Sequence, residues 1–276
     1  MTSDLKSRAA YSVAKARHRW RGRRSIDAPI VVFSMAKTGS SAVVAGLRAV
    51  GHDNVHHVHD LDPEFLAAEE REYHWSGRPW RNWDAQGLCR CMPAASAPWS
   101  VVSLARDPIA QSVSAFFQPG ARRGYLHSGA TVDSLLEQFD DRLESMSTRW
   151  FDAHVLPAFG LDVYAAPFDH DEGHQRLASP VVDLLVLRCE DVTTAGPKPL
   201  ARLVGVDDPI DVPRVNRAED KEHAELYRTF VDALRPSAAV IERAFSSRYV
   251  QHFYSEAEID GFRRRWASDH GERAPR

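Results

Sequence analysis

Short apolar runs alternate with amphipathic stretches along most of the chain. The runs at residues 30–33, 100–105 and 183–188 are mostly apolar, which is typical of strands that are buried on both faces of a sheet. A fourth segment, residues 54–61, mixes valine with histidine and predicts a second strand that ends in a polar loop. Because helical patterns separate these runs, the chain is predicted to form an α/β fold, a central parallel sheet with helices on both faces.

The helical segments have recognisable start and stop residues. Residues 42–50 carry apolar side chains at helical spacing and end at Gly51, and Pro108 stands where another helix is predicted to begin. The predicted helices cover residues 42–50, 63–73, 109–118, 132–151, 198–206, 218–234, 236–246 and 256–266. Residues 74–99 hold four tryptophans without a clear period, which predicts an irregular lid or a packed loop.

Composition limits the class of protein. The 276 residues are 43% hydrophobic and 26% charged, an ordinary globular balance, and the formal net charge of −3 excludes a basic nucleic-acid coat. No apolar run approaches the roughly 20 residues that a membrane span requires. The cysteines, Cys89, Cys91 and Cys189, are odd in number and favour a reduced, cytoplasmic setting; with no second ligand pair beside them, we expect no metal site.

We expect one large domain over residues 29–266, preceded by a basic arm and followed by a flexible tail at 267–276. The arm, residues 1–28, carries eight Lys and Arg side chains within its first 24 positions, opposed there by Asp4 alone. Three interpretations remain open for it. It is a solvated arm, a weak contact with an anionic membrane surface at the inner membrane face, or an organellar transit segment.

The turn after the first predicted strand has the composition of an anion site. It reads Lys37-Thr38-Gly39-Ser40-Ser41 and leads into a helix. The first turn of a helix offers unpaired N–H groups and the positive end of the macrodipole, Gly39 permits close approach, and Lys37 adds a full charge. The alternative is a capped helix start with a solvated lysine. A nucleotide P-loop is disfavoured because Lys37 precedes the single glycine.

A second candidate anion site follows the strand predicted over residues 100–105. Arg106-Asp107-Pro108 stands at its end, where open α/β sheets bind ligands, and Ser114 lies eight residues after Arg106. The planar fork of an arginine suits a terminal phosphate. On a helix that starts at Pro108, Ser114 can converge with Arg106; the alternative is a structural turn with a small serine.

Together the two motifs resemble those of sulfotransferases that use 3′-phosphoadenosine 5′-phosphosulfate. Residues 37–41 resemble the 5′-phosphosulfate loop of that family, and Arg106 with Ser114 and Phe116 resembles its 3′-phosphate motif. Residues 187–192 resemble a Tyr-Glu-Asp-Leu segment in which Cys189 replaces the tyrosine. One departure is Ala36, where many relatives carry proline. The resemblance implies a P-loop-like sulfotransferase fold.

Several shorter features resemble bacterial capsular polysaccharide synthesis or sulfotransferase-like proteins, over residues 29–266. They are His57-Val58-His59-Asp60-Leu61, Trp150-Phe151-Asp152, Asp162-Val163-Tyr164, Pro167-Phe168-Asp169 and His252-Phe253-Tyr254-Ser255. This resemblance implies a carbohydrate or a cell-surface polysaccharide precursor as acceptor.

The resemblance also implies a division of roles. It implies that the protein moves a sulfuryl group from 3′-phosphoadenosine 5′-phosphosulfate to a hydroxyl or amine, and we expect no metal to be required. Lys37 stabilises the charge that grows on the leaving phosphate. Thr38 and Gly39 belong to the donor-binding loop, and Ser40 and Ser41 hold the 5′-phosphate. Arg106 and Ser114 hold the 3′-phosphate.

A hydroxyl acceptor also needs a base. His57 and His59 lie at the end of the second predicted strand and share a face of it, and imidazole titrates near neutral pH. We predict His59 as the base and His57 as its support or alternate, with Glu64 as the fallback. The alternative is that these histidines are ordinary polar residues. The tryptophans of residues 74–99 are either an acceptor platform or packing.

Two other functions remain open from the sequence. The chain is either a non-catalytic nucleotide-binding component of a polysaccharide-synthesis complex or, against its glycine spacing, a nucleotide-dependent phosphotransferase. Neither reading includes nucleic acid as a partner.

Overall fold

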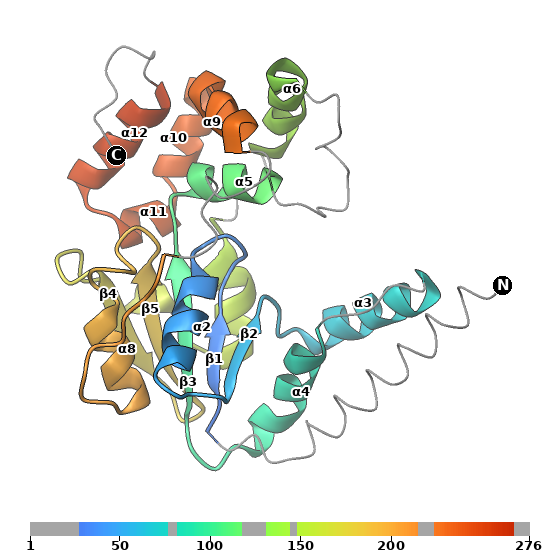
Figure 1. Ribbon diagram of the computed structural model, residues 1–276, viewed down its shortest axis with the longest axis vertical. Coiled ribbons are helices and arrows are strands. Elements are labelled where there is room, and N and C mark those ends of the chain that lie inside the picture. Colours follow the sequence, from blue (N-terminus) through green and yellow to red (C-terminus); the bar gives the residue numbers. More distant parts are fainter. Residues whose placement is uncertain (1–27, 77–81, 118–130, 144–147, 215–223, 268–276) are drawn as a thin grey trace.

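The protein is built on one five-stranded sheet (Figure 1). A computed structural model describes residues 28–76, 82–117, 131–143, 148–214 and 224–267. The sheet has the order β2-β1-β3-β5-β4. Its strands are β1 (Ile30–Phe33), β2 (Val55–Val58), β3 (Trp99–Ala105), β4 (His174–Ala178) and β5 (Val182–Arg188). The predicted α/β class is confirmed, since β2, β1, β3 and β5 run parallel.

The predicted central parallel sheet carries one antiparallel strand, at its edge. β4 pairs antiparallel with β5, with His174 opposite Leu187 and Ala178 opposite Asp183. A short turn joins them, in which the Ser179 N–H donates to the Val182 carbonyl at 2.8 Å. An edge strand has one neighbour and an exposed side, so β4 needs no apolar run; its sequence, His-Gln-Arg-Leu-Ala, gave no strand signal.

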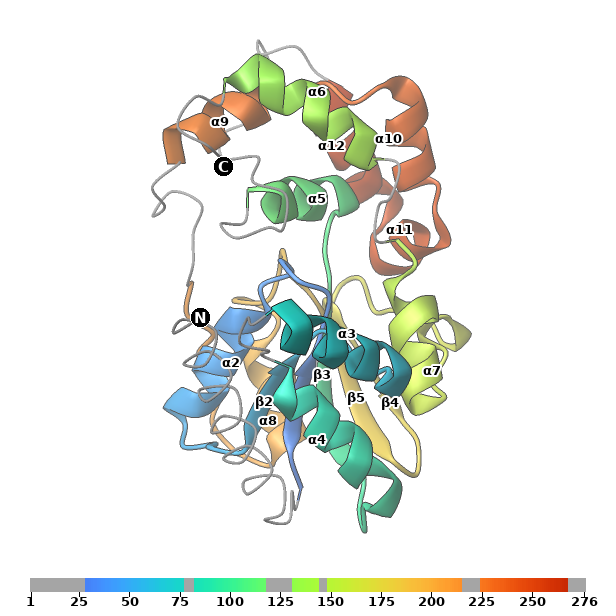
Figure 2. The same cartoon turned by 90° about the vertical axis from the view of Figure 1, so that its right-hand side faces the viewer.

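Helices cover both faces of the sheet (Figure 2). Strand residues alternate between two cores, so that Val32, Val102 and Leu185 face one side and their sequence neighbours face the other. On the first side pack α2 (Ser40–Ala49) and α8 (Pro197–Val204). On the second side lie α3 (Pro63–Ser76), α4 (Trp83–Cys91) and α7 (Leu156–Phe159).

A separate layer of helices lies beyond the carboxyl ends of the parallel strands (Figures 1 and 2). It contains α5 (Pro108–Phe116), α6 (Val132–Leu143), α9 (Ala224–Ala233), α10 (Ala238–Phe245), α11 (Arg248–Phe253) and α12 (Glu256–Ala267). Stacked phenylalanines hold it together: the Phe116 and Phe230 rings are 5.6 Å apart, and Phe139 meets both edge-on. Polar residues at the strand ends therefore face a packed helical layer.

Two sequence predictions need correction, and one helix was not predicted. Residues 74–99 are not an irregular loop within the described residues, because α3 continues to Ser76 and α4 buries Trp83 and Leu88. The helix predicted over 132–151 does not run to its expected end: α6 reaches Leu143, residues 148–149 form a turn, and a π-helical turn occupies Phe151–Val155. Helix α11 was not predicted.

The remaining predicted helices are confirmed within the described residues, with ends that differ by a few positions; residues 218–223 of the helix predicted over 218–234, and residue 118 of the one predicted over 109–118, lie outside the described residues. Residues 1–27 of the basic arm and residues 268–276 of the tail lie outside the described residues. Among the helices that are described, none combines the length and apolarity that crossing a membrane requires.

Candidate functional site

The loop between β1 and α2 is tightly curled. Two of its residues adopt positive φ, Lys37 at 69° and Gly39 at 85°. A Cβ on Gly39 would stand 3.2 Å from Cys189 Sγ, just after β5. Glycine at position 39 therefore serves both the left-handed backbone and the close approach of a neighbouring chain segment. Lys37 has no such steric freedom, so the surrounding structure must hold its backbone in place.

Hydroxyl groups brace the inside of this loop. Thr38 Oγ1 donates to the Met35 carbonyl at 2.8 Å and lies 2.7 Å from Ser34 Oγ, which in turn accepts the Leu104 N–H of β3 at 3.2 Å. Ser34 and Thr38 are both fully buried. The hydroxyl of Thr38 is thus part of the loop framework, and only its main chain is left for the predicted donor-binding role.

The two predicted phosphate motifs lie against each other. Arg106, at the end of β3, donates from Nη1 to the Lys37 carbonyl at 2.6 Å. Gln111 on α5 donates from Nε2 to the adjacent Ala36 carbonyl at 2.9 Å. Ser114 follows Gln111 by three residues on the same helix and is half-buried, so it lies on a neighbouring part of that helix surface. Gln111 was missed at the sequence level.

The predicted histidines also reach the loop. His57 Nε2 lies 2.8 Å from Ser40 Oγ, and the His57 and His59 rings are 4.8 Å apart. Burial, together with the nearby His59 and Arg48, lowers the pKa of His57 to about 4. His57 is therefore neutral at neutral pH.

His59 is oriented by the main chain. Its Nδ1 lies 2.6 Å from the Ser34 carbonyl oxygen. A carbonyl only accepts hydrogen bonds, so Nδ1 carries the proton, and in the neutral ring Nε2 then carries the lone pair. This is the state that a general base needs. Glu64, the fallback base, is exposed on the first turn of α3.

A second polar pair stands beside the histidines. His154, on the π-helical turn, stacks on Trp150 with ring centres 4.3 Å apart, and its Nδ1 is 4.0 Å from Asp60 Oδ2. Burial raises the pKa of Asp60 despite the hydrogen bond it accepts from the Asp62 N–H. The sequence motifs containing Asp60 and Trp150 were noted, but their meeting with His154 was not predicted.

The ends of β3 and β5 carry two hydrogen-bonded carboxylates, the buried Asp107 and Glu190. Asp107 accepts from the Ile109 and Ala110 N–H groups at the start of α5 and from Trp266 Nε1 of α12 at 2.8 Å. Glu190 accepts from the Asp107 N–H and from the Tyr254 hydroxyl, each at 2.9 Å. Burial raises the pKa of both carboxyls. This network joins the sheet to the helical layer.

The remaining predicted residues complete the geometry. Ser40 is buried against His57, and Ser41 is exposed at the start of α2. Burial raises the pKa of the Cys189 thiol to about 11, so this side chain packs against Gly39 as a neutral group. Among the described residues, no group of three or more His, Cys, Asp or Glu side chains is arranged to hold a metal ion.

The arrangement has the chemistry of an anion site with a base beside it. Lys37 and Arg106 supply positive charge, and the first turn of α2 supplies N–H donors. The His57 and His59 pair borders the same loop, from the neighbouring strand end. The structure therefore brings Lys37, Gly39, Ser40 and Arg106 together with both histidines.

Comparison with known proteins adds one finding. Residues 126–255 match the family model NKWYS, described as "Putative capsular polysaccharide synthesis protein". This part of the chain is similar to that family. The match covers just under half of the chain and runs from before α6 to just after α11, so the Lys37 loop and Arg106 lie outside it. No curated protein matches the chain. No solved structure matches it.

Proposed function

We propose that the protein is a sulfotransferase that moves a sulfuryl group from 3′-phosphoadenosine 5′-phosphosulfate to a hydroxyl of a capsular polysaccharide precursor. One observation carries the proposal: Arg106 Nη1 bonds the Lys37 carbonyl, so the two candidate phosphate-binding motifs form one surface. The similarity of residues 126–255 to a capsular polysaccharide synthesis family supports the class of acceptor.

The donor would lie across the Lys37 loop. Main-chain N–H groups at the start of α2 and the exposed Ser41 suit the 5′-phosphate, and Lys37 meets the charge that develops on it. Arg106 and Ser114 suit the 3′-phosphate. Gln111 and Arg106 fix the Ala36 and Lys37 carbonyls, which keeps the loop in one conformation before the donor binds.

Transfer is an in-line displacement at sulfur. The Nε2 atom of His59 takes the proton of the acceptor hydroxyl as the acceptor oxygen bonds to sulfur. The bond from sulfur to the 5′-phosphate oxygen breaks, and its electron pair leaves with 3′-phosphoadenosine 5′-phosphate. His57, neutral and hydrogen-bonded to Ser40, keeps a second positive charge away from the base. No metal takes part in this scheme.

A thermal-shift titration tests the donor site. The bisphosphate product, 3′-phosphoadenosine 5′-phosphate, is expected to stabilise the protein by about 2.7 kcal/mol at a concentration 100 times its Kd. AMP lacks the 3′-phosphate and should stabilise far less at the same concentration, and ATP should do no better. In an Arg106→Ala variant, 3′-phosphoadenosine 5′-phosphate and AMP should stabilise the protein equally. Equal stabilisation of the native protein by AMP would contradict the proposal.

A transfer assay with labelled donor then separates catalysis from binding alone. The proposal expects labelled sulfate to appear on a saccharide acceptor. Tight binding of the bisphosphate without transfer to any hydroxylated acceptor would instead favour a non-catalytic nucleotide-binding component.

A further inference from the structure

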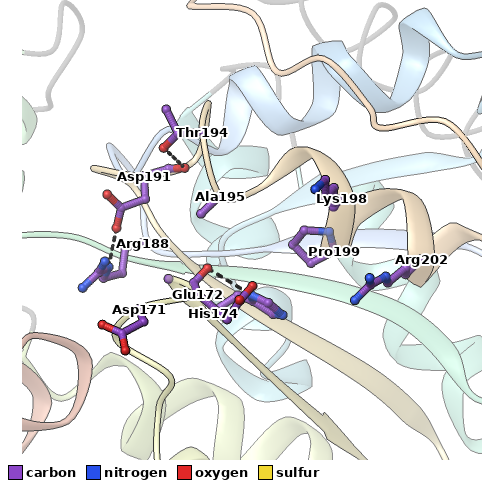
Figure 3. A pocket seen from close by; sticks show the side chains of 11 residues that line it. Asp171, Glu172, His174, Arg188, Asp191, Thr194, Ala195, Lys198, Pro199 and Arg202 are labelled. Atoms are coloured by element: carbon purple, nitrogen blue, oxygen red, sulfur yellow. Dashed lines mark hydrogen bonds and ion pairs between the residues drawn. The ribbon is translucent and has the colours of Figure 1, made fainter.

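A cavity whose lining contains no residue of the Lys37 loop lies beside the antiparallel edge of the sheet (Figure 3). Its volume is about 560 Å³, and it is bounded by α8 on one side and by the turn before β4 on the other. Its lining includes none of the residues assigned to the donor or to the base. A volume of this size falls in the range of small-molecule sites.

On the floor of this cavity, the charged side chains are paired with one another. Arg188 is buried, and it donates to Asp191, to Glu258 at 2.8 Å and to the His170 carbonyl at 3.1 Å. Gly173 has φ of 68°, and a Cβ there would come within 3.1 Å of Ala195 Cβ. The chain thus packs closely around the Arg188–Asp191 pair, and these two charges are matched within the protein.

On the walls of the cavity, by contrast, the charged side chains have no ion-pair partner among the described residues. Lys198 and Arg202 are four residues apart on α8, so they lie on one helix face, and both side chains are exposed. Across the cavity, Asp171 and Glu172 are also exposed (Figure 3). Among the described residues, none of these four side chains has an ion pair within 4.0 Å or a hydrogen bond.

Two exposed cations and two exposed carboxylates thus line the same cavity, and no ion pair joins them. A ligand that fits both walls carries an anionic group for Lys198 and Arg202, and hydrogen-bond donors for Asp171 and Glu172. A simple inorganic anion would satisfy the cations and meet repulsion from the carboxylates. A neutral sugar would leave the cations unpaired. A saccharide with a carboxylate or sulfate group and free hydroxyls satisfies both.

We propose that this cavity is a binding site for an acidic saccharide. All its lining residues fall within residues 126–255, the segment similar to a capsular polysaccharide synthesis family. The site is separate from the donor loop, so the inference goes beyond the proposed transfer reaction and holds even for a protein that transfers nothing. It would anchor a growing acidic chain while another part of that chain is modified.

Titration calorimetry of the full-length protein at low salt tests the site. The probe is a tetrasaccharide of alternating glucuronic acid and N-acetylglucosamine, and its comparison is the same tetrasaccharide with the carboxylates reduced to alcohols. We expect the reduced form to bind at least about tenfold more weakly, because charge-assisted hydrogen bonds to the cations are lost. Equal affinity of the two, or no measurable binding of the acidic form, would overturn the proposal.

Variants locate the binding. Lys198→Gln combined with Arg202→Gln should weaken the acidic tetrasaccharide about tenfold or more, since both charged contacts are removed. Arg243→Gln on α10, an equally exposed cation, is the matched control and should change nothing. Asp171→Asn with Glu172→Gln should also weaken the tetrasaccharide. An unchanged affinity in the Lys198 and Arg202 double variant would overturn the assignment.

Two competitions distinguish this site from simpler ones. Saturating 3′-phosphoadenosine 5′-phosphate should leave the tetrasaccharide affinity unchanged; displacement would place the saccharide in the donor site and refute a separate one. Inorganic sulfate should bind much more weakly than the tetrasaccharide, whereas equal affinity would reduce the cavity to a general anion site.

Discussion

Polar groups at the carboxyl ends of the parallel strands are held in two different ways. At the ends of β3 and β5, Asp107 accepts three hydrogen bonds and Glu190 accepts two, all from the protein itself. At the ends of β1 and β2, His59 is held through Nδ1, which leaves Nε2 as its available lone pair. The first stretch spends its polar groups on structure. The second is the stretch in which we propose that a ligand binds.

A structural polar group differs from the proposed catalytic one in how many of its hydrogen-bonding positions the protein itself occupies. A carboxylate that accepts several hydrogen bonds from the protein stabilises the fold, because removing it leaves those donors unpaired. Trp266 and Tyr254 belong to the helical layer, so the carboxylates fix that layer over the strand ends. The structural stretch thereby sets the geometry in which the other stretch works.

The largest expected effect is on turnover, at the ends of β1 and β2. In Lys37→Ala, kcat should fall about 10²–10³-fold, because one donor to the developing charge is lost in the transition state. The Kd of 3′-phosphoadenosine 5′-phosphate should change much less, and the melting temperature should stay near that of the native protein. The measurements are steady-state kinetics and calorimetry, with Arg243→Gln as the control. A loss of donor affinity with unchanged kcat would contradict the assigned role.

The structural stretch should respond in stability instead. Glu190→Ala leaves the Asp107 N–H and the Tyr254 hydroxyl without their acceptor, and should lower the free energy of unfolding by about 3 kcal/mol. Urea denaturation measures this. Tyr254→Phe removes one of the two bonds and should cost about 1 kcal/mol. A fully stable Glu190→Ala protein that had lost turnover would place Glu190 in the catalytic stretch and reverse the comparison.

Sequence patterns identified the parts of the fold that are buried on two faces. β1, β3 and β5 are apolar because each lies between two neighbours and two helical layers. Edge strand β4 is half-exposed and polar, so its sequence carries no such signal. Helix α4 was missed because its buried side, including Trp83 and Leu88, is narrow and lies in a segment rich in Arg, Gly and Pro.

The parts of the site that stand directly after a strand in the sequence were predictable. The contacts between segments that are far apart in the sequence were not. The Lys37 loop and Arg106 both follow strands that become neighbours, and the carboxyl ends of parallel strands meet at one edge. The contacts of Gln111 with Ala36 and of His154 with Asp60 depend on how α5 and the π-helical turn pack. No local pattern encodes that packing.

The pH dependence of stability tests the histidine side of the comparison. The pKa of His57 is about 4 in the folded protein and near 6.5 when unfolded, so the unfolded chain binds more protons between these values. His57 therefore leaves the free energy of unfolding unchanged above pH 6.5 and lowers it progressively as the pH falls from 6.5 toward 4. The decrease should be about 1–2 kcal/mol, allowing for the partial exposure of the ring.

A His57→Gln variant should therefore show a flatter decline of unfolding free energy between pH 6.5 and 4. His252, whose pKa burial also lowers to about 4, is the matched control. His252→Gln should flatten the same pH range and leave turnover intact, since it contacts Gln175 rather than the Lys37 loop. A His57→Gln protein with an unchanged pH profile would mean that the native His57 is not held neutral.

The smallest expected effect comes from the residue that connects the two stretches. Gln111 lies on α5, which Asp107 caps, and its side chain reaches the Ala36 carbonyl in the Lys37 loop. Gln111→Met keeps the length of the side chain and removes the bond, which should cost about 1 kcal/mol of loop positioning, or roughly fivefold in kcat/KM.

The control is Gln251→Met on α11. It removes a side-chain bond to a main-chain carbonyl, that of Phe245 at 2.7 Å, from an exposed position away from the loop. If Gln111 positions the loop for the donor, its variant raises the KM for the donor or lowers kcat while the Gln251 variant does neither. If both variants lose only stability, Gln111 has a structural role like that of Asp107 and Glu190, and it does not position the Lys37 loop for the donor.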